Sequence, residues 1–312
     1  MSGKIENGGA VAIKGFNYQK ASLILVMINN YSRDGFKVVP EADDDFQIHV
    51  DGQNIYIQVK GEKSITLAKL INEKIIEKNL VPGQDEDIRK IFVWDIGRTF
   101  QGNLEEKKVG HIISPLLKCS SSDKEKIVND LALDLNQQKR LNNQFIYQTP
   151  FSNNLTEAIK YLFGEMVIQK LHVDIESGRA LLAELSLMID QKSETIFDGD
   201  NYQEKEIDGD YLKEIFIQVQ KIEMFNEVLD NLTYNSFRRE KVRQERVKVP
   251  ISYYDIKKNV KSKCKNLDIE TTPEQELVDE IIEVIDSLSN INNGNLKIAI
   301  AIECLCELWE NS

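Results

Sequence analysis

The stretch that decides the fold is PEADDDFQIHVDGQNIYIQVKGE, residues 40–62. It holds two runs in which apolar and polar residues alternate, FQIHV and NIYIQVK, with Asp51-Gly52 between them. Alternation with a period of two predicts β-strands. An Asp-Gly pair between such runs predicts a two-residue hairpin turn, because both turn positions require a positive φ. We therefore expect an antiparallel hairpin whose register is set by the turn.

That register sorts the side chains of the hairpin between two faces. The turn places Val50 opposite Gln53, so Asp45 falls opposite Gln58, and directly opposed residues share a face with Cβ atoms about 5 Å apart. The apolar residues of both strands gather on one face. The other face is predicted to hold Asp43, Asp45, Gln58 and Lys60, with Asp44 pointing away from it.

The residue types on this polar face suit phosphodiester chemistry. Carboxylate and amide oxygens can bind a hard divalent cation such as Mg²⁺, and Glu41, just upstream, offers a second carboxylate. A lysine beside such a metal can orient a water molecule or stabilise charge on a phosphate. An ordinary solvent-facing hairpin would carry the same residues without a chemical role, and the hairpin alone does not decide between the two interpretations.

The pattern around the hairpin predicts an α/β core in the order α-β-β-β-α-β, with a mixed sheet flanked by helices. Helical and strand periodicities give the expected elements, which are a helix over 10–31, a strand over 36–39, the hairpin, an amphipathic helix over 64–80 and strands over 90–96 and 144–151. From Asn153 onward helical patterns dominate. We therefore expect a core over 1–150 and a helical region over 151–312, with linkers near 193–210 and 247–252.

The ordered motifs GG, F-x-YQ, E-x-x-DD and IQVK within residues 8–60 resemble the PD-(D/E)XK nuclease superfamily in its Q-x-K form. They are most similar to the double-stranded DNA endonuclease domain of bacterial antiphage effectors of the CBASS and Lamassu types. The resemblance covers residues 7–170 and extends only loosely to the helices beyond. It implies a restriction-endonuclease-like core.

The resemblance also implies roles for individual residues. Asp45 and Glu41 match metal-binding positions, Lys60 matches the catalytic lysine, and Gln58 stands where a carboxylate is usual and would complete or orient the metal site. Gln19, on the first helix, is either a hydrogen-bonded core amide or a neighbour of the active site, and the resemblance favours the second. The expected cofactor is Mg²⁺, with Mn²⁺ as a possible substitute. Without a carboxylate at position 58, we expect weaker metal binding.

The function implied by the resemblance is that of a Mg²⁺-dependent DNA endonuclease, the effector subunit of an antiphage system, held inactive until a partner or self-association triggers it. The expected partners are double-stranded DNA, further copies of the chain and a defence-complex subunit such as an SMC-like ATPase. Two alternatives stay open. The chain can be a non-catalytic assembly subunit that keeps the nuclease fold, or a restriction-type endonuclease that reads a specific sequence.

Charge and cysteine content restrict these readings. The formal net charge is −12, so the surface repels nucleic acid on average and any DNA contact needs a local basic patch. The densest basic run, RREKVRQERVK at 238–248, could contact phosphates, but a solvated helix face is the favoured interpretation.

Four cysteines, without zinc-site spacing, predict reduced thiols. With no signal peptide and no apolar run long enough to span a bilayer, we expect a cytoplasmic protein without a membrane partner.

Overall fold

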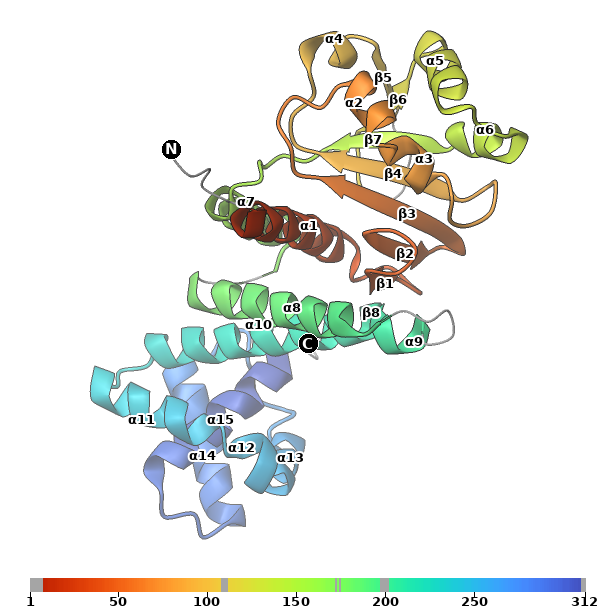
Figure 1. Ribbon diagram of the computed structural model, residues 1–312. Helices are drawn as coiled ribbons and strands as arrows, with labels where there is room; N and C mark the ends of the chain where they lie inside the picture. The colour runs from red at the N-terminus through yellow and green to blue at the C-terminus, as the bar shows by residue number, and fades with distance from the viewer. Residues whose placement is uncertain (1–7, 108–111, 172, 174, 197–201, 310–312) are drawn as a thin grey trace, which may run out of the picture. The chain divides into compact units, whose positions relative to one another are not determined.

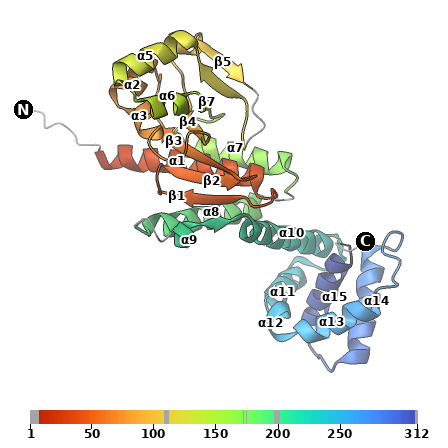
Figure 2. The ribbon, with the colours of Figure 1, turned by 90° about the vertical axis from the view of Figure 1, so that its right-hand side faces the viewer.

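The computed structural model describes residues 8–107, 112–171, 173, 175–196 and 202–309. The chain forms two compact units, Met1–Phe216 and Ile217–Ser312. Within the described residues, the first unit holds an eight-stranded sheet with helices on both faces (Figures 1 and 2). The second unit is helical. The mixed α/β class expected from the sequence is thereby confirmed.

The sheet has the strand order β5-β6-β7-β4-β3-β2-β1-β8. The three central strands β3, β4 and β7 run parallel, and the other neighbours are antiparallel. The carboxyl ends of the three parallel strands therefore meet at one end of the sheet, which we call the carboxyl end. The strands span Lys37–Pro40 (β1), Phe46–Val50 (β2), Gln53–Lys60 (β3), Ile88–Val93 (β4), Leu104–Lys107 (β5), Leu116–Cys119 (β6), Gln144–Gln148 (β7) and Ile207–Asp208 (β8).

The β2–β3 hairpin has the register predicted from its turn. Val50 pairs with Gln53, and Phe46 pairs with Ile57 at the far end of β2. Asp51 and Gly52 both adopt a positive φ, at 53° and 72°, as a tight turn of this length requires.

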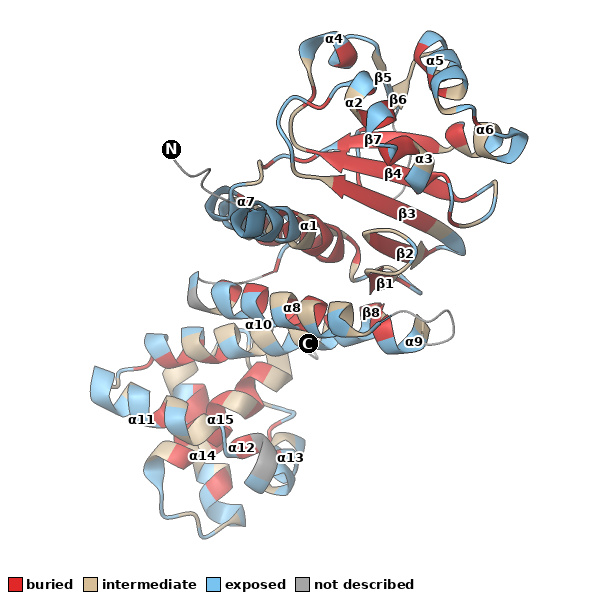
Figure 3. Ribbon diagram, in the orientation of Figure 1, coloured by how far each residue is buried: buried red, intermediate tan, exposed pale blue. Residues whose placement is uncertain are grey.

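Two helical layers cover the sheet. Helix α1 (Gly8–Asn30) packs against β3 and α7 (Leu155–Ile168) on one side, and its buried residues run almost continuously from Tyr18 to Asn30. On the other side, an apolar cluster joins β4 and β7 to α2 (Leu67–Asn72), α3 (Ile75–Asn79), α5 (Ser121–Leu131) and α6 (Leu135–Leu141). The central strands are buried between these layers (Figure 3).

The predicted order α-β-β-β-α-β is present up to β4, with one difference. The helix expected over 64–80 is divided into α2 and α3. Lys74, at the junction, adopts a left-handed conformation with φ of 55°. A single left-handed residue interrupts an α-helix, because it turns the chain out of the helical path.

The segment 202–208, expected to be part of a linker, instead extends the sheet. Residues 197–201 lie outside the described part of the chain. After them α9 (Tyr202–Lys205) leads into β8, which pairs antiparallel with β1. β8 covers the outer side of β1, where unpaired backbone groups would otherwise be exposed. The other described helices of this unit are α4 (Arg98–Gln101) and α8 (Ile175–Glu194), and α10 (Gly209–Asn231) begins in it.

In the second unit, helices surround the apolar α15 (Gly294–Trp309), whose residues Ile298–Ile302 are all buried. The other helices are α11 (Ser236–Arg246), α12 (Val249–Ser252), α13 (Tyr254–Lys263) and α14 (Glu274–Leu288). Val249, in the second segment expected to be a linker, is fully buried. All four cysteines are free, as expected. None of the described helices is long and apolar enough to cross a membrane.

The basic run 238–248 lies mainly on α11, and much of its charge is neutralised nearby. Arg243 pairs with Asp230 at 2.8 Å, and Arg246 pairs with Glu303 at 2.6 Å. Lys248 pairs with Glu245 at 2.7 Å. These pairs agree with the favoured interpretation of a structural helix face.

One lysine of the sheet is buried without a partner. Lys90, on β4, is fully buried, and its ammonium makes no hydrogen bond with any described residue. Burial, with a smaller contribution from the charge of nearby Arg33, lowers the pKa of Lys90 to about 7. The unfolded chain therefore holds more protons than the folded chain between pH 7 and about 10.5, so this residue makes stability rise with pH across that window.

We predict that Lys90→Met raises the free energy of unfolding at pH 7 by at least about 1 kcal/mol, because each pKa unit corresponds to about 1.4 kcal/mol. The variant should also lose most of the increase in stability between pH 7 and pH 9. Urea denaturation at both pH values measures this, with the exposed Lys126→Met as the control. A variant that is less stable than the unaltered protein at pH 7 would contradict the prediction.

Candidate active site

The carboxylate of Asp45 joins the two strands of the hairpin at the carboxyl end of the sheet. Strand pairing stops at Phe46, and Asp45 precedes it. Its Oδ2 accepts hydrogen bonds from the backbone N–H of Val59 and from Nε2 of Gln58, both at 2.5 Å. The structure thus brings Asp45 and Gln58 together, as the register indicates.

Glu41 and Gln19 lie on the other side of Asp45. The chain folds back over residues 41–45, with Glu41 at a positive φ of 49° and its N–H donating to the Asp45 carbonyl at 3.0 Å. Nε2 of Gln19, from α1, donates to Glu41 Oε1 at 2.6 Å and to the Asp45 carbonyl at 3.0 Å. Gln19 is therefore a direct neighbour of the acidic residues, and it fixes the turn that carries them.

Lys60 ends β3 beside these carboxylates. Burial raises the pKa values of Asp44 and Asp45, and the positive charge of Lys60 partly opposes that increase. Its side chain is partly exposed and its ammonium has no hydrogen-bond partner among the described residues. Lys60 is thus a charged group close to Asp45 that is not committed to a structural contact.

The prediction that Asp44 points away from these residues is wrong. Because pairing ends at Phe46, the two-residue alternation does not continue back to Asp43. Asp43 is exposed, and its charge adds to the burial that raises the pKa values of Tyr56 and Tyr202. The aspartate that interacts electrostatically with Asp45 and Lys60 is Asp44.

Asp44 is held by a chain of buried amides that the sequence did not point to. Its Oδ2 accepts a hydrogen bond from Asn79 Nδ2 at 2.5 Å, and Asn79 Oδ1 accepts one from Gln144 Nε2 at 2.9 Å. Asn79 is fully buried at the end of α3. This series of hydrogen bonds links the acidic turn to β7, which lies beyond β4 in the sheet.

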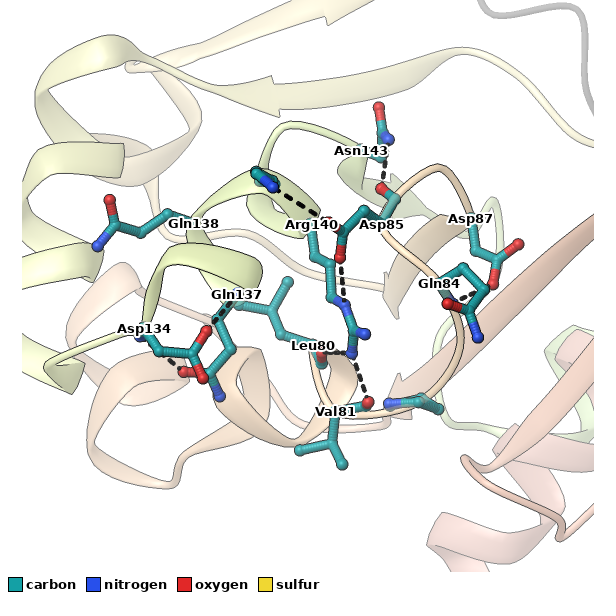
Figure 4. A network of polar contacts seen from close by, with 12 residues as sticks. Leu80, Val81, Gln84, Asp85, Asp87, Asp134, Gln137, Gln138, Arg140 and Asn143 are labelled. Atoms are coloured by element: carbon teal, nitrogen blue, oxygen red, sulfur yellow. Dashed lines mark hydrogen bonds and ion pairs between the residues drawn. The ribbon is translucent and has the colours of Figure 1, made fainter.

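The loop that follows Asn79 is fixed by α6 (Figure 4). Arg140 donates to the carbonyls of Leu80 and Val81 at 3.1 and 2.7 Å and to Asp85 Oδ1 at 3.1 Å. Asn143 donates to the Asp85 carbonyl at 3.0 Å. These bonds satisfy carbonyls at the end of α3 that have no partner within the helix, so the position of Asn79 is constrained from both sides.

Burial perturbs every carboxyl group of the site in the same direction. Burial raises the pKa of Asp44 to about 7. It also raises the pKa values of Asp45 and Glu41, against the opposing effects of the Val59 N–H on Asp45 and of Gln19 on Glu41. A bound cation would favour the charged forms and offset this desolvation. Clustered buried carboxyls with raised pKa values are typical of functional sites.

Lys205, which the sequence did not identify, also acts on this cluster. It belongs to α9, is almost fully buried, and donates to the Thr195 carbonyl at 2.6 Å. Its charge lowers the pKa of Glu41. Only the pairing of β8 with β1 brings this lysine near the hairpin, and the sequence carries no signal for that pairing.

The donor set is compatible with a divalent metal ion. Free oxygens remain on Glu41, Asp45 and Gln58, since one oxygen of each accepts no hydrogen bond from a described residue and none of these atoms is enclosed. Among the described residues no group of three or more His, Cys, Asp or Glu side chains could hold a metal. Two carboxylates and one amide would leave the remaining positions to water and phosphate oxygens, an arrangement that suits Mg²⁺.

We predict that Asn79→Ala lowers the free energy of unfolding by roughly 2–3 kcal/mol, because it leaves a carboxyl and an amide unpaired in the interior. Gln144→Leu removes the other amide of the same hydrogen-bonded series. In a double-mutant cycle measured by urea denaturation, the two changes should be coupled by at least about 0.5 kcal/mol. Effects that simply add would show that the amides do not act as a unit.

Comparison with known proteins places the chain in a family. The sequence matches no protein-family model. It is 43% identical over 317 residues to the Lamassu protein LmuA of Bacillus sp. (strain NCIM 5461 / CCTCC AB 2011126 / NIO-1130), an alignment that covers 98% of this chain and 99% of that protein. Such identity over both whole chains shows common descent, and the chain therefore belongs to the family of the Lamassu protein LmuA.

Proposed function

We propose that the chain is a metal-dependent double-stranded DNA endonuclease with a restriction-endonuclease-like core, acting as the effector of a Lamassu-type antiphage defence system. The observation that carries the proposal is the convergence of Glu41, Asp45, Gln58 and Lys60 at the carboxyl end of β3, where hydrogen bonds join Asp45 both to β3 and to the turn that carries Glu41. The family supports the defence context, because its member is named as a Lamassu protein.

The roles follow from the positions of the side chains. Glu41 and Asp45 would hold Mg²⁺ through their free oxygens, and Gln58 would orient Asp45 through its Nε2 and offer its own amide oxygen. A bound Mg²⁺ would supply Lewis acidity toward the scissile phosphate and lower the pKa of a water molecule. Lys60 would orient the attacking water and stabilise charge on the phosphate. Gln19 would keep Glu41 and Asp45 in register.

Regulation and location follow from the proposed activity. A nuclease of this kind must be restrained from cutting the DNA of its own cell, and the net charge of −12 contributes by repelling the duplex at long range. We propose that self-association or a partner such as an SMC-like ATPase overcomes this restraint. The protein would act in the cytoplasm, where its DNA substrate lies.

The two other candidates are less well supported. A non-catalytic assembly subunit has no need to cluster buried carboxyl groups beside an uncommitted lysine, because burying charge costs stability. A restriction-type enzyme requires a surface that reads bases. The most basic helix, α11, instead pairs its arginines with Asp230 and Glu303.

Plasmid cleavage tests the proposal. In Mg²⁺, together with the products of neighbouring genes, the chain should linearise or degrade supercoiled plasmid, and Lys60→Ala should reduce the rate at least about 100-fold, as expected for loss of electrostatic stabilisation of the transition state. The control is Lys126→Ala, which removes an exposed lysine from α5 and should leave the cleavage rate unchanged. Equal rates for the unaltered chain and Lys60→Ala would exclude the catalytic role.

The absence of a carboxylate at position 58 leads to a second prediction. Gln58→Glu adds a carboxylate to the metal site, so the Mg²⁺ concentration that gives half-maximal cleavage should fall several-fold, because cation affinity rises with ligand charge. Titrations of Mg²⁺ at a fixed DNA concentration measure this, with Gln58→Leu as the variant that removes the amide oxygen. The account of the site is incorrect if the glutamate variant requires as much Mg²⁺ as the unaltered chain.

A further inference from the structure

Two loops leave the carboxyl end of the sheet directly beside the candidate active site. The first, residues 61–66, follows Lys60 at the end of β3, and the second, residues 94–97, follows β4. Since β3 and β4 are adjacent and parallel, with Lys60 paired to Val93, the two loops start one strand spacing apart, which is about 4.8 Å.

The two loops are joined to each other by hydrogen bonds. Ile65 forms an isolated parallel bridge with Ile96. Ile65 N–H donates to the Asp95 carbonyl at 2.9 Å, and Gly97 N–H donates to the Ile65 carbonyl at 2.8 Å. Ser64 N–H donates to the Asp95 carboxylate at 2.8 Å. The pair of loops therefore behaves as an extension of the sheet rather than as two independent segments.

The base of the first loop is also held from the other side. The Gly61 carbonyl accepts a hydrogen bond from Asn153 Nδ2 at 2.5 Å. A Cβ at Gly61 would lie 3.0 Å from the ring of Tyr18, so this glycine allows the loop to pack directly on α1. Groups on the loop are thus held in a fixed place relative to Lys60.

The first loop carries an exposed cation, Lys63, and the second leads directly into another, Arg98, the first residue of α4. Lys63 and Arg98 are both exposed, and neither forms an ion pair or side-chain hydrogen bond with any described residue. By contrast, the acidic Glu62 is neutralised by Lys69, which also pairs with Glu73. Asp95 is engaged by the Ser64 N–H. Lys63 and Arg98 are therefore two exposed cations, on loops next to Lys60, that pair with no described carboxylate.

We propose that Lys63 and Arg98 form a phosphate-binding pair that places the backbone of a DNA duplex against the active site. Exposed, uncommitted cations on a rigid support are suited to phosphate oxygens, and such contacts fix the position of the duplex without reading its sequence. The pair supplies the local basic patch that a chain of net charge −12 requires for DNA binding. This inference rests on the proposed function, since it names how the same site receives its substrate.

The salt dependence of DNA binding tests the pair directly. Each phosphate contact contributes a slope of about −0.9 to the plot of log K against log salt concentration. Lys63→Ala and Arg98→Ala should each make the slope shallower by about one, and the double variant by about two. The loss of affinity should be the same for two duplexes of unrelated sequence, because phosphate contacts carry no base information.

The measurement uses the full chain, Ca²⁺ in place of Mg²⁺ to limit cleavage, and fluorescence anisotropy of a labelled duplex over roughly 50–200 mM salt. The control is Lys126→Ala, which removes the same charge from an exposed position without an ion pair to a described residue. Lys126 lies on α5, which follows β6, and β6 runs antiparallel to β7. Helix α5 therefore begins at the end of the sheet opposite Lys60.

Three results are possible. Shallower slopes for Lys63→Ala and Arg98→Ala, with no change for Lys126→Ala, support the inference. If the unaltered chain binds and cuts DNA but the slopes do not change, or change equally for Lys126→Ala, the inference is overturned and the proposed nuclease function stands. If the unaltered chain neither binds nor cuts a duplex even with the products of the neighbouring genes present, the proposed function fails and the inference fails with it.

Discussion

The bond between the Asp45 carboxylate and the backbone N–H of Val59 is the constraint on which the rest of the site depends. Strand pairing of the hairpin stops at Phe46, and this bond extends the connection by one residue through a side chain. It determines where the acidic turn begins, and hence where Glu41 folds back toward Asp45. The turn also provides the two hydrogen-bond acceptors of Gln19, which lies on α1. A change at the hairpin register would therefore move every candidate residue at once.

Burying the carboxyl groups of the site costs free energy, as their pKa values indicate. Burial raises the pKa values of Glu41, Asp44 and Asp45, so the protein keeps them close together against the preference of charge for water. Hydrogen bonds from Gln19, Asn79 and the Val59 N–H compensate in part. A structure without chemical function has little reason to maintain such a cluster, whereas a cation would complete it.

The register of the hairpin could be predicted from the sequence, but the contacts that surround it could not. The Asp-Gly turn fixes a local register, so the meeting of Asp45 with Gln58 could be predicted from spacing alone. The parity argument failed at Asp44, because it assumed that the strand continues through residues that instead form a turn. Asn79 and Lys205 reach the site through α3 and through the β8–β1 pairing. These are long-range contacts, which no local pattern encodes.

The most direct test of the central claim is to locate a divalent metal ion in crystals of the protein grown with Mn²⁺ and a short DNA duplex. Anomalous scattering identifies the ion independently of the assumed ligands. The account predicts Mn²⁺ within about 2.2 Å of oxygens from both Glu41 and Asp45, with a phosphate oxygen of the duplex in its coordination sphere. Mn²⁺ bound elsewhere, with Glu41 and Asp45 still joined only to Gln19, Gln58 and Val59, would contradict it.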